Sequence, residues 1–196
     1  HYCDIIPLYR SQRRKKVLIL KQGIILYQSK YGATQKYANW LSDKTGFDCI
    51  AVDKADMKQI QQYDVIVLGG AIYASGISGL SFLKKHMEAL RGKRLVVFCV
   101  GASPYDKKAV EQIHQHNLKG KLKNIPCFYC RGAWDENIMS FKDRSLCKML
   151  QKAVSRKDPS ACESWEVALI EAIGKKCDWT DETYLTPLLD YLSQQK

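Results

Sequence analysis

The feature that most limits the fold of this chain is a repeated alternation of short apolar runs and helical periods, which begins at Gly23. The apolar runs lack polar alternation, which is typical of parallel strands buried on both faces. Strands are predicted at residues 23–27, 48–52, 64–69, 94–100 and 125–130. Helices are predicted between and after them, at residues 34–45, 80–90, 106–116 and 138–154.

Strands that alternate with helices of about ten residues indicate parallel strands joined by right-handed crossovers. Five such units favour an α/β fold, a doubly wound three-layer sandwich, and are too few for an eight-stranded barrel. Residues 23–154 are therefore predicted to form one domain. Residues 155–196 are predicted to form a C-terminal helical appendage, whose last helix begins after Thr186 and Pro187. Residues 1–22 lack the alternation and are interpreted as a basic N-terminal extension.

The charge distribution favours anionic partners. The chain carries a net charge of +11, and residues 23–154 carry 20 basic and 11 acidic residues, a net charge of +9. Phosphates, acidic membrane surfaces and nucleic acid are all compatible with this charge. The eight cysteines are too few for a disulfide scaffold in a chain of this size, so a reduced, cytoplasmic protein is expected. No apolar run approaches the roughly 18 residues that cross a bilayer.

Three loops at the carboxyl ends of strands are the expected ligand site, because open parallel sheets bind ligands beyond these ends. The first loop runs from Gln28 to Thr34 and leads directly into a helix. Its glycine, its hydroxyls and the helix N-terminus could surround a phosphate with N–H and O–H donors. A turn in which Thr34 merely caps the helix is the alternative. The loop lacks the Gly-Lys-Ser/Thr ending and the G-x-G-x-x-G pattern, which argues against ATPase and dinucleotide sites.

The second and third loops share a different character. Residues 70–79 and 101–106 are rich in small residues, and each loop carries one tyrosine, Tyr73 or Tyr105. Two such loops could clamp a flat ring from both sides, with main-chain amides at its polar edge. Short surface loops with one exposed tyrosine each are the alternative.

The first loop carries a family resemblance. The segment from Ser29 to Thr34, Ser-Lys-Tyr-Gly-Ala-Thr, resembles the phosphate loop T/S-x-T-G-x-T of the flavodoxin superfamily, with Tyr31 in place of the central threonine. Together with the segment from Gly69 to Tyr73, Gly-Gly-Ala-Ile-Tyr, it is similar to the branch that contains menaquinone-dependent protoporphyrinogen oxidase. The resemblance covers residues 23–154. It implies a five-stranded parallel sheet in the order 2-1-3-4-5, helices on both faces, and FMN as cofactor.

The resemblance also implies which residues hold FMN. The phosphate is expected on Ser29, Lys30, Tyr31, Gly32, Ala33 and Thr34. The isoalloxazine ring is expected between Ala71, Ile72 and Tyr73 on one side and Gly101, Ser103 and Tyr105 on the other. Trp134 is a further aromatic candidate, for which a core contact is the alternative. Because the flavin supplies the redox chemistry, no catalytic acid or base is predicted.

Two functions follow from the resemblance. The first is an FMN-dependent oxidoreductase, similar to protoporphyrinogen oxidase, that uses an organic redox substrate and a quinone or other acceptor. The second is a flavodoxin-type electron carrier without its own substrate. Carriers of this type resemble one another in being acidic, whereas the basic charge here suits an anionic porphyrin or a peripheral contact with an anionic membrane. A receiver-type signalling domain would need carboxylates where Tyr27 and Gly70 stand.

Other motifs favour structural roles. Cys127 and Cys130 have the spacing of a redox or zinc motif, but residues three apart on a strand point to opposite faces. His114 and His116 diverge on a predicted helix, so no metal site is expected. The basic runs at 13–16 and 119–123 lack interleaved aromatic residues, so no nucleic-acid partner is expected.

Overall fold

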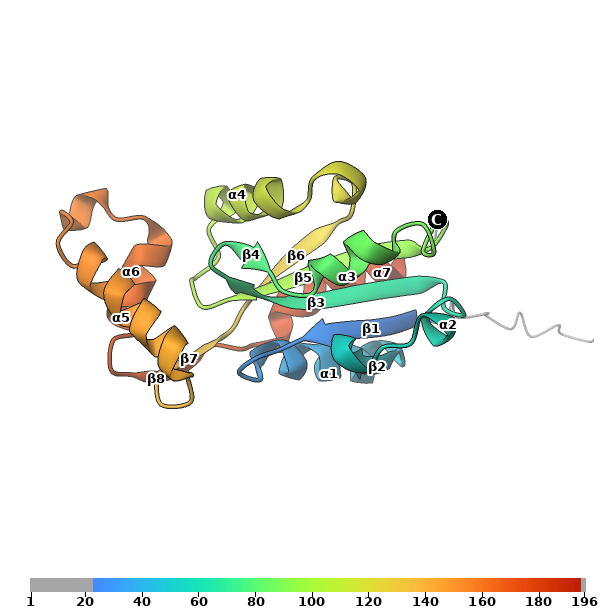
Figure 1. The fold of residues 1–196 in the computed structure, drawn as a ribbon, viewed down its shortest axis with the longest axis horizontal. Helices are drawn as coiled ribbons and strands as arrows, with labels where there is room; N and C mark the ends of the chain where they lie inside the picture. Colours follow the sequence, from blue (N-terminus) through green and yellow to red (C-terminus); the bar gives the residue numbers. More distant parts are fainter. Residues whose placement is uncertain (1–22, 195–196) are drawn as a thin grey trace, which may run out of the picture.

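The fold is a parallel sheet covered by helices on both faces (Figure 1). The computed structural model describes residues 23–194, so the predicted extension at 1–22 lies outside the described residues. The sheet has the order β2-β1-β3-β5-β6, and each neighbouring pair in it is parallel. Its strands are Gly23–Gln28 (β1), Asp48–Ala51 (β2), Val65–Tyr73 (β3), Arg94–Gly101 (β5) and Cys127–Arg131 (β6). The predicted order 2-1-3-4-5 is therefore confirmed, since β4 (Gly76–Ile77) pairs only with the end of β3.

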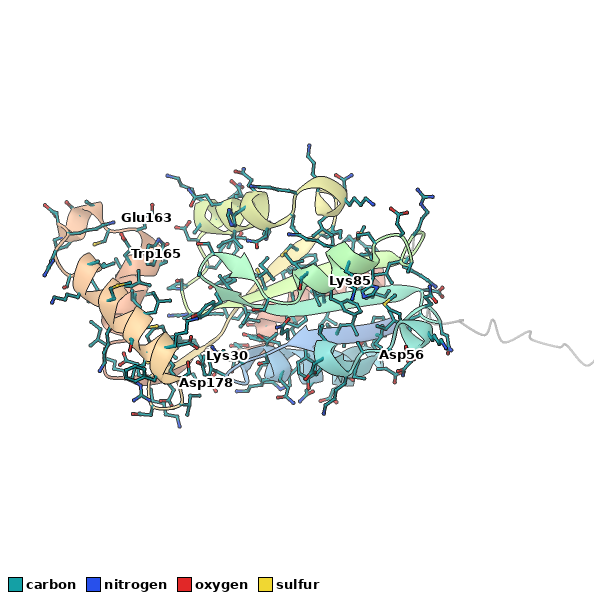
Figure 2. All side chains as sticks on the ribbon, viewed as in Figure 1. Lys30, Asp56, Lys85, Glu163, Trp165 and Asp178 are labelled. Atoms are coloured by element: carbon teal, nitrogen blue, oxygen red, sulfur yellow. The ribbon has the colours of Figure 1, made fainter. Side chains whose placement is uncertain are left out.

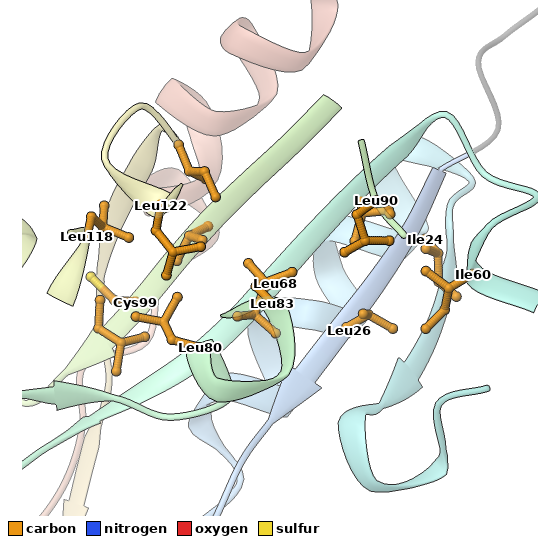
Figure 3. Close-up of a cluster of buried hydrophobic side chains, with 14 of the residues drawn as sticks. Ile24, Leu26, Ile60, Leu68, Leu80, Leu83, Leu90, Cys99, Leu118 and Leu122 are labelled. Atoms are coloured by element: carbon orange, nitrogen blue, oxygen red, sulfur yellow. The ribbon is translucent and has the colours of Figure 1, made fainter. Parts of the chain in front are cut away.

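Alternation along the strands divides the core between the two faces. On one face, Ile24, Leu26 and Leu68 pack under α2 (Met57–Ile60), α3 (Leu80–His86) and α4 (Lys107–Asn117) (Figure 3). On the other face, Ile25 and Phe98 pack under α1 (Ala33–Thr45) and α7 (Thr186–Ser193). Short 3₁₀ turns at Val52–Lys54, Gly120–Leu122, Pro159–Ala161 and Glu182–Leu185 connect these elements.

The segment after β3 is a hairpin rather than the predicted loop. β3 continues to Tyr73, so Ala71, Ile72 and Tyr73 lie on its end, and β4 pairs with it antiparallel. The buried Asn117 clamps the turn: its Nδ2 donates to the carbonyl of Ser75 over 2.7 Å, and its Oδ1 accepts from the amide of Ile77 over 2.9 Å. Composition alone indicated a loop, because the small residues of the turn carry no strand signal and Asn117 is distant in sequence.

A smaller unit lies beside the sandwich at the left of Figure 1. The strands β7 (Ala133–Asp135) and β8 (Lys176–Asp178) form an antiparallel pair, and α5 (Phe141–Val154) packs against α6 (Ser164–Glu171). We call residues 133–178 the side unit. The predicted helix at 138–154 is α5 of the side unit, whereas α7, which lies within residues 155–196, packs on the sheet through the fully buried Leu188. Helical periodicity indicates an apolar face but not which surface covers it. The predicted boundary at residue 154 stays a prediction.

Within residues 23–194, we find no helix whose length and hydropathy would let it span a bilayer.

Candidate functional site

A cavity of about 410 Å³ lies at the carboxyl ends of β1, β3 and β5, where the side unit faces the sandwich. Its volume is in the range of small-molecule and cofactor sites. The lining residues are Gln28, Ser29, Lys30, Tyr31, Ala33, Thr34, Ala71, Ile72, Tyr73, Ser78, Val100, Gly101, Ala102, Gly132, Ala133, Trp134, Met139, Asp143 and Cys147. All the predicted cofactor residues line this cavity except Gly32, Ser103 and Tyr105.

The loop after β1 presents the N-terminus of α1 to the cavity. Gly32 is the N-cap in a left-handed conformation with φ of 96°, and no side chain caps the helix. Its amide donates to Ser29 Oγ over 3.1 Å, which tightens the turn. The first amides of α1 are therefore free to bind an anion at the positive end of the helix dipole. Thr34, which is 1% exposed, adds a hydroxyl group at the cavity wall.

The opposite part of the cavity is apolar and bounded by small residues. Ala71 and Ile72 come from β3, and Gly101 ends β5. A Cβ at Gly101 would lie 3.0 Å from Tyr129 Oη and 3.2 Å from Ile72 Cδ1, so a side chain there would crowd this wall. Trp134, on β7, supplies an aromatic wall from the side unit. An anion-binding helix end beside an apolar wall fits the phosphate and the ring of FMN.

Two predicted ring contacts lie elsewhere. The backbone carbonyl of Ser103 accepts a hydrogen bond from Tyr129 Oη. Tyr105 is 59% exposed, and its ring packs against that of Tyr129, with the ring centroids 6.1 Å apart. Both tyrosines line a second cavity. The loop after β5 thus turns toward β6. Ser103 and Tyr105 therefore do not line the first cavity, and their contact with the flavin ring stays a prediction.

The side unit contributes a carboxylate that the sequence analysis missed. Asp143, whose side chain is 3% exposed, accepts hydrogen bonds from Lys30 Nζ, Tyr31 Oη and, over 2.7 Å, Tyr73 Oη. The bond from Lys30, with the two tyrosine bonds, holds the pKa of Asp143 well below its usual range. The bonds to Asp143 also raise the pKa of Lys30 and of Tyr73. Lys30 lies where the sandwich meets the side unit (Figure 2).

Asp143 changes what the predicted phosphate loop offers. Lys30 and Tyr31 bind a carboxylate of the side unit, so their side chains are engaged before any phosphate arrives. The backbone amides and Thr34 are unaffected by this contact. No sequence signal distinguishes Asp143, because its place three residues after Ser140 is that of an ordinary residue in a helix's first turn, where its amide donates to Ser140 Oγ over 3.2 Å.

Comparison with known proteins gives one family. A family model described as "Flavodoxin domain" matches residues 24–160. A search of curated proteins finds no match. This match agrees with the predicted resemblance and with FMN as the cofactor of an FMN-binding, flavodoxin-like fold. The match gives the flavodoxin domain only and does not include the branch that contains protoporphyrinogen oxidase.

A search of solved structures finds similar proteins in several bacteria. A flavodoxin, WrbA-like protein from Agrobacterium tumefaciens has 21% sequence identity and a TM-score of 0.43. The alignment covers 63% of this chain and 88% of that protein. Megasphaera elsdenii flavodoxin has 17% identity and a TM-score of 0.42, covering 55% and 82%. The Trp repressor binding protein of Bacillus subtilis has 19% identity and a TM-score of 0.41, covering 57% and 83%. The family assignment rests on the match to residues 24–160.

Proposed function

The chain belongs to the flavodoxin-domain family, and on this premise we propose that it is an FMN-dependent oxidoreductase with its own organic substrate. The observation that carries the proposal is the second wall of the cavity. Trp134, Met139 and Cys147 of the side unit face the ends of β3 and β5 across it. A carrier needs only an accessible flavin edge, whereas a walled, largely apolar space beside the ring can hold an organic molecule.

We propose a division of labour among the cavity residues. The amides that follow Gly32, with the hydroxyls of Ser29 and Thr34, hold the phosphate. Ala71, Ile72, Tyr73 and Gly101 border the ring, and Trp134 covers it from the side unit. Bound FMN supplies reversible two-electron redox chemistry, while the protein fixes its position and excludes water. Asp143 stays ionised at neutral pH, so it serves as a positioning residue that orients the hydroxyls of Tyr31 and Tyr73.

The surface of the side unit supports an apolar, membrane-dissolved quinone as acceptor. Several large apolar side chains of this unit are exposed: Ile138, Phe141, Met149, Leu150, Trp165, Val167 and Ile173. Phe141, at the start of α5, is 88% exposed and lies two residues from Asp143 at the cavity. Of the elements that carry them, α5 is basic, with Lys142, Arg144, Lys148 and Lys152. Exposed apolar side chains beside basic residues are typical of surfaces that rest on anionic membranes. We therefore propose peripheral membrane contact through α5, with a quinone reaching the cavity from that side.

Quinone reduction tests this function. Protein loaded with FMN is photoreduced under anaerobic conditions, with EDTA as the electron donor, and is mixed with increasing concentrations of a soluble menaquinone analogue. Reoxidation of the flavin should be saturable in the quinone and at least about tenfold faster than that of free reduced FMN at the same concentration. Reoxidation that is unsaturable and no faster than that of free FMN, together with rapid exchange with a flavodoxin reductase, would instead assign the chain as an electron carrier.

The proposed phosphate site predicts an unusual effect of Asp143→Asn. The substitution keeps the shape of the side chain, removes a negative charge beside the phosphate and frees Lys30 to bind it. We expect the affinity for FMN to rise about tenfold, which corresponds to about 1.4 kcal/mol. Quenching of flavin fluorescence during titration measures it. Because the pKa of Asp143 lies well below its usual range, lowering the pH to about 5 should not reproduce the effect.

Asp178→Asn is the matched control for Asp143→Asn. Asp178 also belongs to the side unit and also pairs with a lysine of the sandwich, Lys36, over 2.9 Å, but it does not line the cavity. Its substitution should leave FMN affinity within about twofold of the parent. If Asp143→Asn bound FMN no more tightly than Asp178→Asn, the phosphate would not lie near Asp143.

A further inference from the structure

A cluster of soft metal ligands lies away from the flavin cavity. Sγ of Cys99, Sγ of Cys127 and a ring nitrogen of His114 all lie within 4.8 Å of one another. One continuous β-α-β segment supplies them: Cys99 is on β5, His114 on α4 and Cys127 on β6. The strand register brings the cysteines together, because Cys127 lies opposite Val97, and Cys99 is two residues further along the same face. The helix that crosses over this face adds the histidine.

The surroundings of these three side chains favour a bound metal ion over two thiols that only pack against each other. Cys99 is fully buried in the cluster that also contains Leu80 and Leu118 (Figure 3). Nε2 of His114 is shielded from solvent and has no hydrogen-bond partner among residues 23–194. Leaving a buried ring nitrogen without a partner costs about 1–3 kcal/mol. A metal ion between the three side chains would be bound by a ring nitrogen of this imidazole.

We propose that Cys99, His114 and Cys127 bind one Zn²⁺ ion. Two thiolates and a neutral imidazole give a complex with Zn²⁺ that carries no net charge, as a site in an apolar core requires. Zn–S bonds of about 2.3 Å in a tetrahedron place two sulfurs about 3.8 Å apart, so the present separations need only small side-chain movements. Cu⁺ with the same ligands would leave a net negative charge buried.

The fourth position of the tetrahedron opens toward solvent. A second cavity of about 440 Å³ is lined by both His114 and Cys127, with Tyr105 and Tyr129 beside them. A water molecule can therefore complete the coordination, as in zinc sites with three protein ligands.

Metal titration of the full chain tests this site. The protein is kept under a non-chelating reductant and titrated with Co²⁺, whose visible bands lie at longer wavelengths than flavin absorption, and then with Zn²⁺. We expect one Co²⁺ per chain with a tetrahedral, sulfur-ligated spectrum. One equivalent of Zn²⁺ should displace it, with an affinity for Zn²⁺ tighter than about 1 µM. His114→Ala, Cys99→Ala and Cys127→Ala should each weaken binding at least about 100-fold.

The chain offers matched control variants on α4 and on β6. His116→Ala alters the neighbouring histidine of α4, and Cys130→Ala removes a cysteine of β6 that packs on the other face of the sheet. Both should bind Zn²⁺ as the parent does. Because Cys99 is buried, circular dichroism is used to check that each variant is folded. If Cys99→Ala does not fold, the test rests on His114→Ala, because His114 is only half-buried. Absence of stoichiometric binding, or binding that survives both His114→Ala and Cys127→Ala, would overturn the proposal.

Discussion

Replacing Gly32 and Thr34 together by valine should abolish FMN retention while leaving the chain folded. Gly32 has a φ of 96°, which a β-branched residue adopts only with strain, so the turn that aims the α1 amides would change. Thr34→Val keeps the side-chain volume and removes its hydroxyl. Hydrogen bonds to a charged group contribute about 1.5–3 kcal/mol each. Loss of two of them should weaken FMN binding at least about 100-fold, as measured by fluorescence titration and by the flavin content of purified protein.

Gly46→Val separates this effect from general strain. Gly46 ends the same helix with a φ of 71°, and a Cβ at either glycine would meet nothing within 4 Å. The two positions therefore carry a similar backbone penalty, but only Gly32 adjoins the cavity. Gly46→Val should lower thermal stability and keep its FMN. Equal flavin content in the double variant and in Gly46→Val would remove the phosphate-loop assignment.

A second large effect is expected from Gly70→Ala, a change of one methyl group. A Cβ at Gly70 would lie 2.1 Å from the carbonyl oxygen of Ser78 and 2.7 Å from Ile77 Cγ2. Because the closest atom belongs to the backbone, the hairpin that follows β3 must move away. We expect a loss of about 3 kcal/mol in the free energy of unfolding, measured by denaturant titration, and weaker FMN binding through displacement of Tyr73.

Gly76→Ala is the control on the same hairpin. A Cβ there would come no closer than 3.4 Å to the carbonyl of Tyr73, which is ordinary contact. The stability of Gly76→Ala should fall by less than about 1 kcal/mol. If the two alanine variants were equally stable, the close approach of β3 and β4 would not be a feature of the folded protein.

The part of the fold that could be predicted from sequence is the part with local signals. Unbroken apolar runs such as 94–100 specify strands buried on both faces, and their alternation with helices restricts the topology. The loop after β1 was also recognisable, because a glycine between hydroxyl residues before a helix has a local meaning. The contacts of Asn117 with the hairpin, and of Asp143 with Lys30, join residues far apart in sequence and leave no pattern in it.

The same reason explains which parts of the structure the sequence alone did not show. Helix 138–154 and helix α7 both have amphipathic sequences, and only the packed structure shows that Leu188 covers the sheet while α5 packs against α6. The direction of the loop at 101–106 depends on Tyr129, which holds Ser103 toward β6. The cluster of Cys99, His114 and Cys127 has no ligand spacing, because strand register and a crossover helix assemble it.

The most direct test of the central claim compares FMN with riboflavin, which lacks the phosphate but carries the same ring. Flavin-free protein is titrated with each ligand under identical conditions, and binding is followed by flavin fluorescence. If the amides between Gln28 and Gln35 grip the phosphate, riboflavin should bind at least about 100-fold more weakly than FMN. Equal affinity for the two ligands would contradict the account, because the phosphate would then contribute nothing at the N-terminus of α1.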